Sequence, residues 1–281
     1  YKLIVSICTY VMTNYLTFLC FIPYQFMLKY NRFENRGTLM KEHIKNVFAV
    51  IASLSIILII LITSIDFHAF NRSFYESEYK DMHTAQSMGM SQNGLMSATS
   101  TLLDYLHDER NDIKVSESVY GVDREVFNDR ETMHMVDVKN LYQNVLSLRK
   151  MAIIGCAISL VYLFIAYRKK AFLTLSIYFN KVATIFLLVI AALAIWALCD
   201  FYSFWTGFHR LFFTNDLWLL NPATDLMINM FPQDFFFHMV FRITITFSIL
   251  FGSLFIVSKI YLKKWRKANI EDINSTKEHY L

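Results

Sequence analysis

Cysteine is scarce in this sequence, and the positions of the cysteines argue against a disulfide-rich domain and against a zinc-binding domain. All four cysteines lie in or beside apolar runs, none falls in the long polar segments, and no two form a CxxC pair: Cys8, Cys20, Cys156 and Cys199. Neither a disulfide framework nor a zinc cage is therefore indicated. Proline and glycine are also rare in residues 68–150, which contain no repeats, so we expect no flexible linker there.

Short catalytic motifs are absent as well. The sequence has no GxSxG, no P-loop, no HExxH and no glycine-rich phosphate cradle. It therefore offers little for covalent, ATP-driven or zinc-protease chemistry. We expect no cofactor and no bound metal. We also expect neither a nucleotide nor a nucleic acid as partner, because the net charge of +4 comes from short basic loops.

Long apolar runs are what the sequence has in abundance. With 55% hydrophobic and 16% aromatic residues, its composition is that of a membrane protein rather than a soluble domain. Four uncharged runs approach the ~20 residues that a helix needs to cross hydrocarbon: Leu3–Leu28, Val47–Ile65, Met151–Tyr167 and Val182–Cys199. A fifth, Ile243–Ser258, reaches that length if the Arg242 side chain extends to the membrane surface.

Basic residues in the loops predict the orientation of these spans. They cluster at Lys29–Lys45, Arg168–Lys181 and Lys259–Lys267, and short basic loops face the cytoplasm. Residues 68–150 and 200–238 are then both extracytoplasmic. The first run has neither an initiator methionine nor a small-residue cleavage site, so we expect an anchoring span rather than a signal peptide.

These patterns predict an all-α polytopic membrane protein with a small helical extracytoplasmic cap. Within the cap, Leu95–Leu106 has helical patterning. Asn128 can cap a helix that has Glu131 at its third position. That helix leads into the run at Met151 and carries His134 on the same face as Asp137.

The second external segment is dense in aromatic residues. Asn221 followed by a proline predicts the start of a short helix with Asp225 one turn in, and Pro232 ends it. Aromatic rings at a membrane surface can enclose a water-poor chamber that suits a lipid-linked substrate. For each single ring, membership of an interfacial belt is the competing interpretation. The rings lie within residues 201–218: Phe201, Tyr202, Phe204, Trp205, Phe208, Phe212, Phe213 and Trp218.

Two histidines have the placement expected of a site at the membrane surface. His134, in ETMHMVDVK, precedes the run that starts at Met151, and His209 follows the run that ends at Cys199. A hairpin of the two spans places both imidazoles on one face of the membrane. With pKa values near 6.5, two imidazoles can act as base and acid at neutral pH, which typically contributes about 10²- to 10⁴-fold in rate.

At these residues the sequence resembles a known family. ETMHMVDVK at 131–139, FHRLFFTNDLWLLNPATDLMINMFP at 208–232 and, more weakly, LLDYL at 102–106 resemble the bacterial lipoprotein intramolecular transacylases. The resemblance covers residues 47–262, so that residues 1–46 form an additional N-terminal span with a basic loop. It implies a core with spans at about 47–66, 151–167, 182–199 and 239–260, a cap from residues 67–150 and 200–238, and a cytoplasmic tail at 263–281.

The resemblance also implies an activity and a site. The activity is transfer of the sn-2 acyl chain of a diacylglyceryl lipoprotein to the α-amino group of its N-terminal cysteine, at the extracytoplasmic face of a bacterial cell membrane. His134 and His209 take the positions of the two catalytic histidines, and their individual roles stay open. The partners are a diacylated lipoprotein and membrane lipid. We expect substrate binding by Asp137, Phe208, Phe212, Phe213, Trp218 and Asp225.

Two other functions remain possible at this stage. One is a non-catalytic membrane sensor or assembly module whose cap binds a ligand. The other is a metal-dependent hydrolase that uses His134, Asp137 and His209 as ligands. Six further histidines are interpreted as structural or solvated: His43, His68, His83, His107, His238 and His279. Arg242 lies just inside the last span, where an ionisable residue is a functional candidate, but extension of its side chain to the outer membrane surface explains it equally well, so it is left out of the predicted site.

Overall fold

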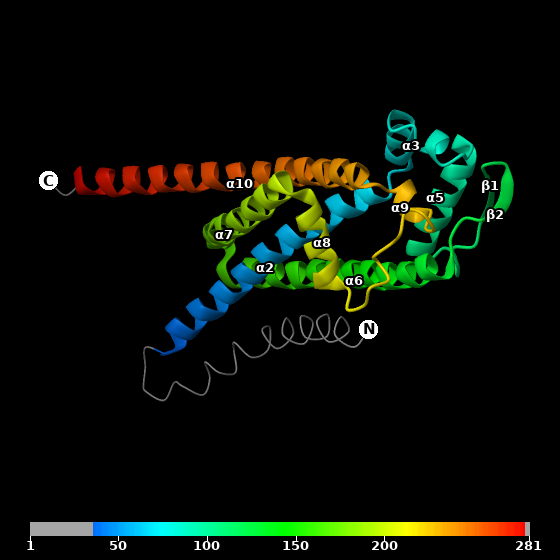
Figure 1. Cartoon of the computed structure of the whole chain (residues 1–281). Coiled ribbons are helices and arrows are strands. Elements are labelled where there is room, and N and C mark those ends of the chain that lie inside the picture. The colour runs from blue at the N-terminus through cyan, green and yellow to red at the C-terminus, as the bar shows by residue number, and fades with distance from the viewer. Residues whose placement is uncertain (1–35, 279–281) are drawn as a thin grey trace. The chain divides into compact units, whose positions relative to one another are not determined.

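The computed structural model describes residues 36–278, which form helices and one β-hairpin (Figure 1). The elements in chain order are α2 (Arg36–Ala69), α3 (Arg72–Asp81), α4 (Thr84–Ser87), α5 (Gln92–Leu106), β1 (Ser116–Val119), β2 (Val122–Glu125), α6 (Asp129–Tyr167), a 3-10 turn (Arg168–Lys170), α7 (Ala171–Cys199), α8 (Phe201–Phe212), α9 (Met227–Met230) and α10 (Gln233–Glu278).

Four of the described helices are long and apolar enough to cross a membrane. They are α2, α6, α7 and α10, and they contain the four predicted runs from Val47 onward. The predicted all-α membrane fold is thus confirmed. The predicted span at Leu3–Leu28 lies outside the described residues.

The chain divides into two compact units, which we describe separately. The cap unit comprises Thr63–Leu148 and Leu193–Thr244. The span unit comprises residues 36–62, Arg149–Ala192 and residues 245–278 within the described part of the chain.

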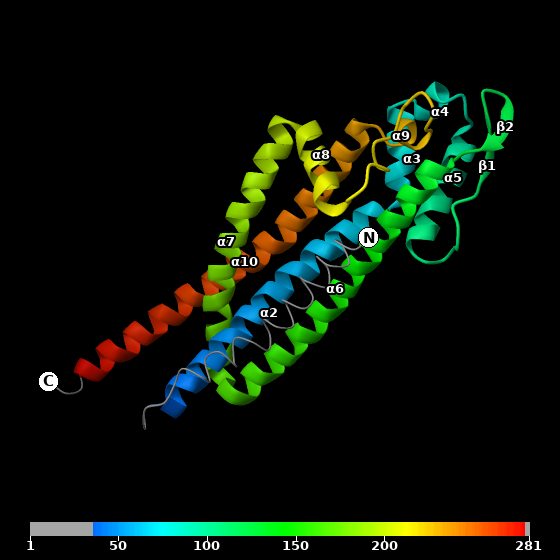
Figure 2. The same cartoon turned by 60° about the horizontal axis from the view of Figure 1, so that its bottom comes forward.

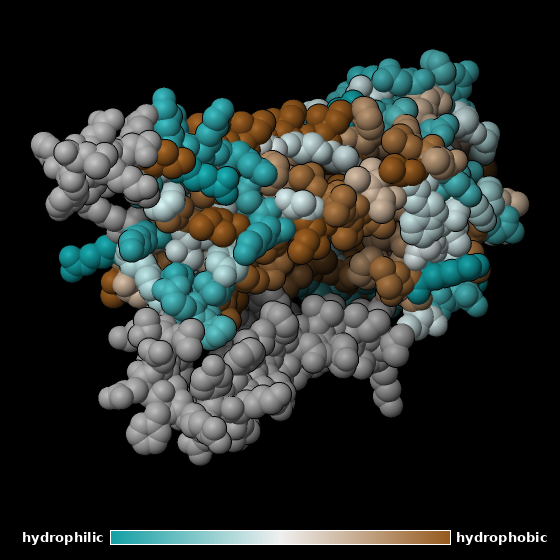
Figure 3. Space-filling view, turned by 90° about the vertical axis from the view of Figure 1, so that its left-hand side faces the viewer, coloured by the Kyte–Doolittle hydropathy of each residue, from teal (hydrophilic) through white to brown (hydrophobic). Residues whose placement is uncertain are grey.

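Aromatic packing and one polar cluster hold the span unit together. Ile57, Phe179 and Phe251 are buried against one another, and the Asn180 Nδ2 donates to Ser258 Oγ at 2.6 Å and to the Ser176 carbonyl at 2.8 Å. Hydrogen bonds between helices serve this purpose in lipid, where the hydrophobic effect gives helices no reason to associate. Figure 3 shows hydrophobic residues, in brown, on the face that it draws. The exposed apolar side chains of the span unit include Ile185, Leu188, Val189, Ile249, Leu254 and Val257.

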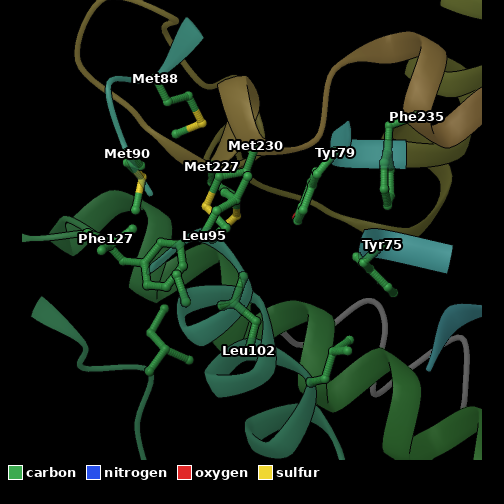
Figure 4. Close-up of a cluster of buried hydrophobic side chains, with 14 of the residues drawn as sticks. Tyr75, Tyr79, Met88, Met90, Leu95, Leu102, Phe127, Met227, Met230 and Phe235 are labelled. Atoms are coloured by element: carbon green, nitrogen blue, oxygen red, sulfur yellow. The ribbon is translucent and has the colours of Figure 1, made fainter. Parts of the chain in front are cut away.

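The cap unit has its own hydrophobic core, built from α3, α5, α9 and the beginnings of α6 and α10 (Figure 4). Tyr79 is almost fully buried, its ring lies 6.0 Å from that of Phe235, and its hydroxyl is 2.8 Å from Thr99 Oγ1. Ser91 caps α5 by accepting from the Gly94 N–H at 2.9 Å. The helix predicted at Leu95–Leu106 is confirmed within α5.

A β-hairpin in the cap unit was not predicted. Strands β1 and β2 pair antiparallel beside α5, joined by Tyr120 and Gly121, which both have positive φ (Figure 2). Two consecutive residues of positive φ match the twist of a two-residue hairpin turn. The sequence does not predict these strands, because each has only four residues and every side chain of β2 is exposed. Neither strand therefore has an alternation of apolar and polar residues.

The start of α6 confirms the predicted capping box. The Asn128 Oδ1 accepts from the Glu131 N–H at 3.0 Å, and Glu131 Oε2 accepts from the Asn128 N–H at 2.7 Å. The other carboxylate oxygen of Glu131, which is 1% exposed, accepts from the Met227 N–H at 2.6 Å. Glu131 therefore joins the start of α6 to the start of α9.

The short helix predicted from Asn221 is wrong in its position. The helix α9 begins only at Met227, so Asp225 precedes it instead of lying one turn inside. The side chain of Asn221 accepts from the Ala223 N–H at 3.0 Å, and Asp225 Oδ2 accepts from the Asn221 N–H at 2.6 Å. Asn and Asp side chains that bind nearby backbone in this way stabilise turns at the expense of helix.

Candidate active site

The two histidines come from different helices and meet in the cap unit. His134 lies near the start of α6, and His209 lies in the last turn of α8. Their ring centroids are 6.2 Å apart. Asp200 caps α8, and its carboxylate accepts from the Ser203 N–H at 2.9 Å. The prediction that the two imidazoles lie close together is therefore confirmed.

The surroundings of His209 fix one tautomer. Its Nδ1 lies 2.8 Å from the carbonyl oxygen of Trp205, one helical turn earlier, and a carbonyl can only accept. Nδ1 therefore carries the proton, and Nε2 keeps its lone pair. Burial lowers the pKa of His209 below its usual 6.5, although the bond to the Trp205 carbonyl acts in the opposite direction. Burial thus favours a neutral imidazole whose Nε2 can accept a proton.

His134 is the more enclosed of the pair. Its side chain is 7% exposed, and the ring of Phe213 meets it edge-on at 5.3 Å between centroids. Among the described residues, its buried Nδ1 has no hydrogen-bond partner. A buried imidazole nitrogen of this kind is unusual in a purely structural histidine, because an unpaired buried polar atom costs free energy.

Aromatic rings surround His209. Trp205, Phe208, Phe213 and Trp218 all have ring centroids within 5.6 Å of its imidazole, and the Trp218 ring is stacked on it at 5.0 Å. Phe212 does not join this shell directly but packs on Phe208 at 4.8 Å. Trp205 was not among the predicted site residues. It lies four residues before His209, and this spacing places the two side chains on the same face of a helix.

The two predicted carboxylates have different surroundings. Asp137 is partly buried one turn after His134, and its Oδ2 accepts from Asn215 Nδ2 at 2.8 Å. Asp225 is buried and accepts from Asn128, Asn221 and Thr224 rather than contacting the histidines. Burial acts to raise the pKa of Asp225, but these hydrogen bonds outweigh it and hold the pKa below its usual value.

A separate polar cluster accounts for His238 and Arg242. The buried Glu78 accepts from His238 Nδ1 at 2.6 Å and pairs with Arg242 at 3.5 Å. The Arg242 guanidinium also lies 4.6 Å from the centre of the Phe74 ring. His238 and Arg242 therefore have partners in this separate cluster.

Comparison with known families shows which family the chain belongs to. Residues 50–236 match the family described as lipoprotein intramolecular transacylase Lit, a stretch that covers more than half of the chain and contains both histidine motifs. The chain belongs to the lipoprotein intramolecular transacylase family. It is therefore an acyltransferase of the membrane, and its substrate is a lipoprotein. The alternative of a non-catalytic membrane module is not supported.

Solved structures of a transacylase have the same fold as this chain. The membrane-integral Lit from Bacillus cereus is 23% identical, with a TM-score of 0.64 over 81% of this chain and 99% of that one. Variants of the Bacillus protein in which one histidine is replaced by alanine or by arginine match at 22% identity and a TM-score of 0.61, over 83% and 84% of this chain and 100% of theirs. A comparison with curated proteins finds no significant match.

The geometry around His134 and His209 gives no support to the metal-dependent alternative. Within residues 36–278, no group of three or more His, Cys, Asp or Glu side chains is placed so that it could hold a metal ion. His134, Asp137 and His209 therefore do not form a ligand set in this arrangement.

Proposed function

We propose that the enzyme transfers the sn-2 acyl chain of a diacylglyceryl lipoprotein to the α-amino group of the N-terminal cysteine of the same molecule. An amide C–N bond forms, the sn-2 ester C–O bond breaks, and a proton passes from the nitrogen to the glyceryl oxygen. The product is an N-acylated lyso-form lipoprotein. The single observation that carries the proposal is the pair of imidazoles, 6.2 Å apart, in a chain of this family.

His209 is suited to remove the proton from the substrate ammonium. That group has a pKa of about 8 and is mostly charged at neutral pH, so it must lose a proton before its nitrogen can attack the ester carbonyl. The bond from Nδ1 to the Trp205 carbonyl leaves Nε2 of His209 as the acceptor. Burial supports this role because it favours the neutral ring.

His134 is suited to the opposite task. As the tetrahedral intermediate forms and collapses, negative charge develops first on the carbonyl oxygen and then on the glyceryl oxygen. A neutral imidazole can donate its one N–H in a hydrogen bond to these oxygens, and it can relay to the glyceryl oxygen the proton that His209 removes from the attacking nitrogen. The side chain of His134 is buried beside His209, where such hydrogen bonds are stronger than in water.

Asp137 and the aromatic rings complete the proposed site. One oxygen of Asp137 is fixed by Asn215, and its carboxylate can attract the substrate ammonium toward the histidines. Phe208, Phe212, Phe213 and Trp218 supply apolar surface for the acyl chains. We place the site at the extracytoplasmic face, because the basic loops between the predicted spans belong in the cytoplasm.

A labelled substrate tests this proposal. The purified full chain is incubated in detergent with a synthetic diacylglyceryl lipopeptide whose sn-2 chain alone carries an isotope label. Tandem mass spectrometry should find the label in an amide on the cysteine nitrogen, and a lipopeptide with a blocked amino group should keep its label in the ester. Label that stays on the glyceryl group of the unblocked peptide, or passes to a second lipopeptide of different mass, contradicts the proposal.

A further inference from the structure

The loop between α8 and α9, residues 213–226, is built as a fixed strap and not as a loose connection (Figure 1). Its backbone is held by its own side chains: Asn215 Oδ1 accepts from the Leu217 N–H at 3.0 Å, and Asn221 Oδ1 accepts from the Ala223 N–H at 3.0 Å. Asx turns of this kind fix a loop without the help of regular secondary structure.

The strap is also tied to the first turns of α6. Arg130 donates to the carbonyl oxygen of Asp216, and Asn215 donates to Asp137 at 2.8 Å. At the far end of the strap, Asn128 donates to Asp225 at 2.8 Å. The strap is therefore bonded at several points to the helix that carries His134.

These bonds hold Trp218 over the imidazole of His209. The two rings are stacked at 5.0 Å with an angle of 30° between their planes. Phe213, at the start of the strap, is 5% exposed and contacts both histidines, at 5.3 Å and 5.6 Å between centroids. The strap thus contributes two of the rings that separate the histidine pair from solvent.

Shielding matters here because water competes with the substrate amine. A base that activates an amine can also activate water, whose oxygen then attacks the same sn-2 carbonyl. In that reaction the new C–O bond forms, the ester C–O bond breaks, the glyceryl oxygen takes the proton, and a free fatty acid leaves. A transacylase must therefore limit the access of water to its base, and a closed site is the usual means.

We propose that Trp218 determines the outcome of the reaction, transfer rather than hydrolysis, by covering His209, and that Asn215 is a positioning residue that holds Trp218 there. This inference rests on the proposed acyl transfer. It predicts that loosening the strap diverts acyl chains to water. Loss of a ring that only binds the substrate would slow the reaction without changing its products.

The test measures the ratio of two products from the labelled lipopeptide in H₂¹⁸O. Trp218→Ala should raise the ratio of ¹⁸O-labelled free fatty acid to N-acyl product by about tenfold or more, the effect of ~1.4 kcal/mol in relative barrier heights. Trp218→Phe keeps a ring at the position and should give a ratio closer to that of the wild type. Leu219→Ala is the matched control, because it removes an exposed apolar side chain from the same strap and should leave the ratio unchanged.

A second variant acts on the strap and leaves the ring in place. Asn215→Ala removes the bond to Asp137 and should raise the ratio in the same direction, even if Trp218→Ala does not fold. A fall in N-acyl product with no gain in free fatty acid in both variants would overturn this inference. Absence of N-acyl product from the wild-type chain would instead overturn the proposed acyl transfer itself.

Discussion

His209 is the residue whose chemistry is most constrained by its surroundings. The carbonyl of Trp205 fixes its tautomer, and four aromatic rings and a second imidazole lie around it. Together these contacts favour a ring that is neutral at physiological pH and has Nε2 available. A general base needs both properties.

The pH dependence of activity should reflect this environment. Since burial lowers the pKa of His209, the imidazole stays neutral down to a pH below 6.5 and protonates only in more acidic solution. The acid limb of kcat/KM should therefore have its midpoint below pH 6.5, while the substrate ammonium sets a basic limb near pH 8. Rates of N-acylation in buffers of constant ionic strength measure both limbs, and an acid midpoint above 6.5 contradicts the assignment of His209 as base.

At this scale the sequence revealed the histidines but not all of their partners. The motifs around His134 and His209, and the hairpin between them, were sufficient to predict that the rings meet. Asn215 could not be found in the same way, because its contact with Asp137 depends on the path of the α8–α9 loop. That path is set by Asx turns, which leave only a weak trace in sequence.

The junction of α6 and α9 is the element-scale feature on which the site depends most. Glu131 accepts from the backbone N–H groups of both Asn128 and Met227, so its removal leaves two donors without a partner. Glu131→Ala should lower the free energy of unfolding by about 1–3 kcal/mol for each donor that stays buried. The midpoint of thermal unfolding in detergent measures the effect. Glu125→Ala, which removes an exposed carboxylate from β2, is the control, and an equal shift in both variants contradicts the role of Glu131.

Helices were predictable from the sequence where the apolar pattern was long or where the capping residues were close neighbours in the chain. The four apolar runs from Val47 onward and the Asn128–Glu131 capping box required only neighbouring residues. The β-hairpin was missed because its short strands have no alternating pattern and it is held in place by distant segments. The Tyr120 hydroxyl, for example, donates to the Ser87 carbonyl at 2.6 Å. The start of α9 was misplaced because Asn221 and Asp225 bind nearby backbone in turns.

For the whole molecule, the orientation in the membrane follows from the charges of the loops and is open to direct measurement. In a cysteine-free background, Asp123→Cys in the cap unit should react with an impermeant maleimide added to intact cells, because the loop charges predict that the exposed hairpin faces outward. Lys170→Cys, between α6 and α7, should react only after the cells are permeabilised. Labelling in the reverse order contradicts an extracytoplasmic site.

The overall architecture was the part most open to prediction. Hydrocarbon thickness dictates the length of a spanning helix, so the four spans within residues 36–278 could be located from the apolar runs alone. The proposed catalysis by two histidines cannot be deduced from composition in this way. The structure is needed to show that the two rings lie together, and membership of the family is needed to indicate the reaction.

The most direct measurement is the mass spectrum of a lipoprotein N-terminus, purified from a bacterial host that makes only diacyl lipoproteins and expresses this chain. The wild type should yield a fragment with an N-acyl group on a monoacylglyceryl cysteine. His134→Ala and His209→Ala should each reduce it by at least about 10²-fold, the usual contribution of a general acid or base. Unchanged N-acylation by either variant, with the protein shown to be inserted and folded, would contradict the two-histidine mechanism.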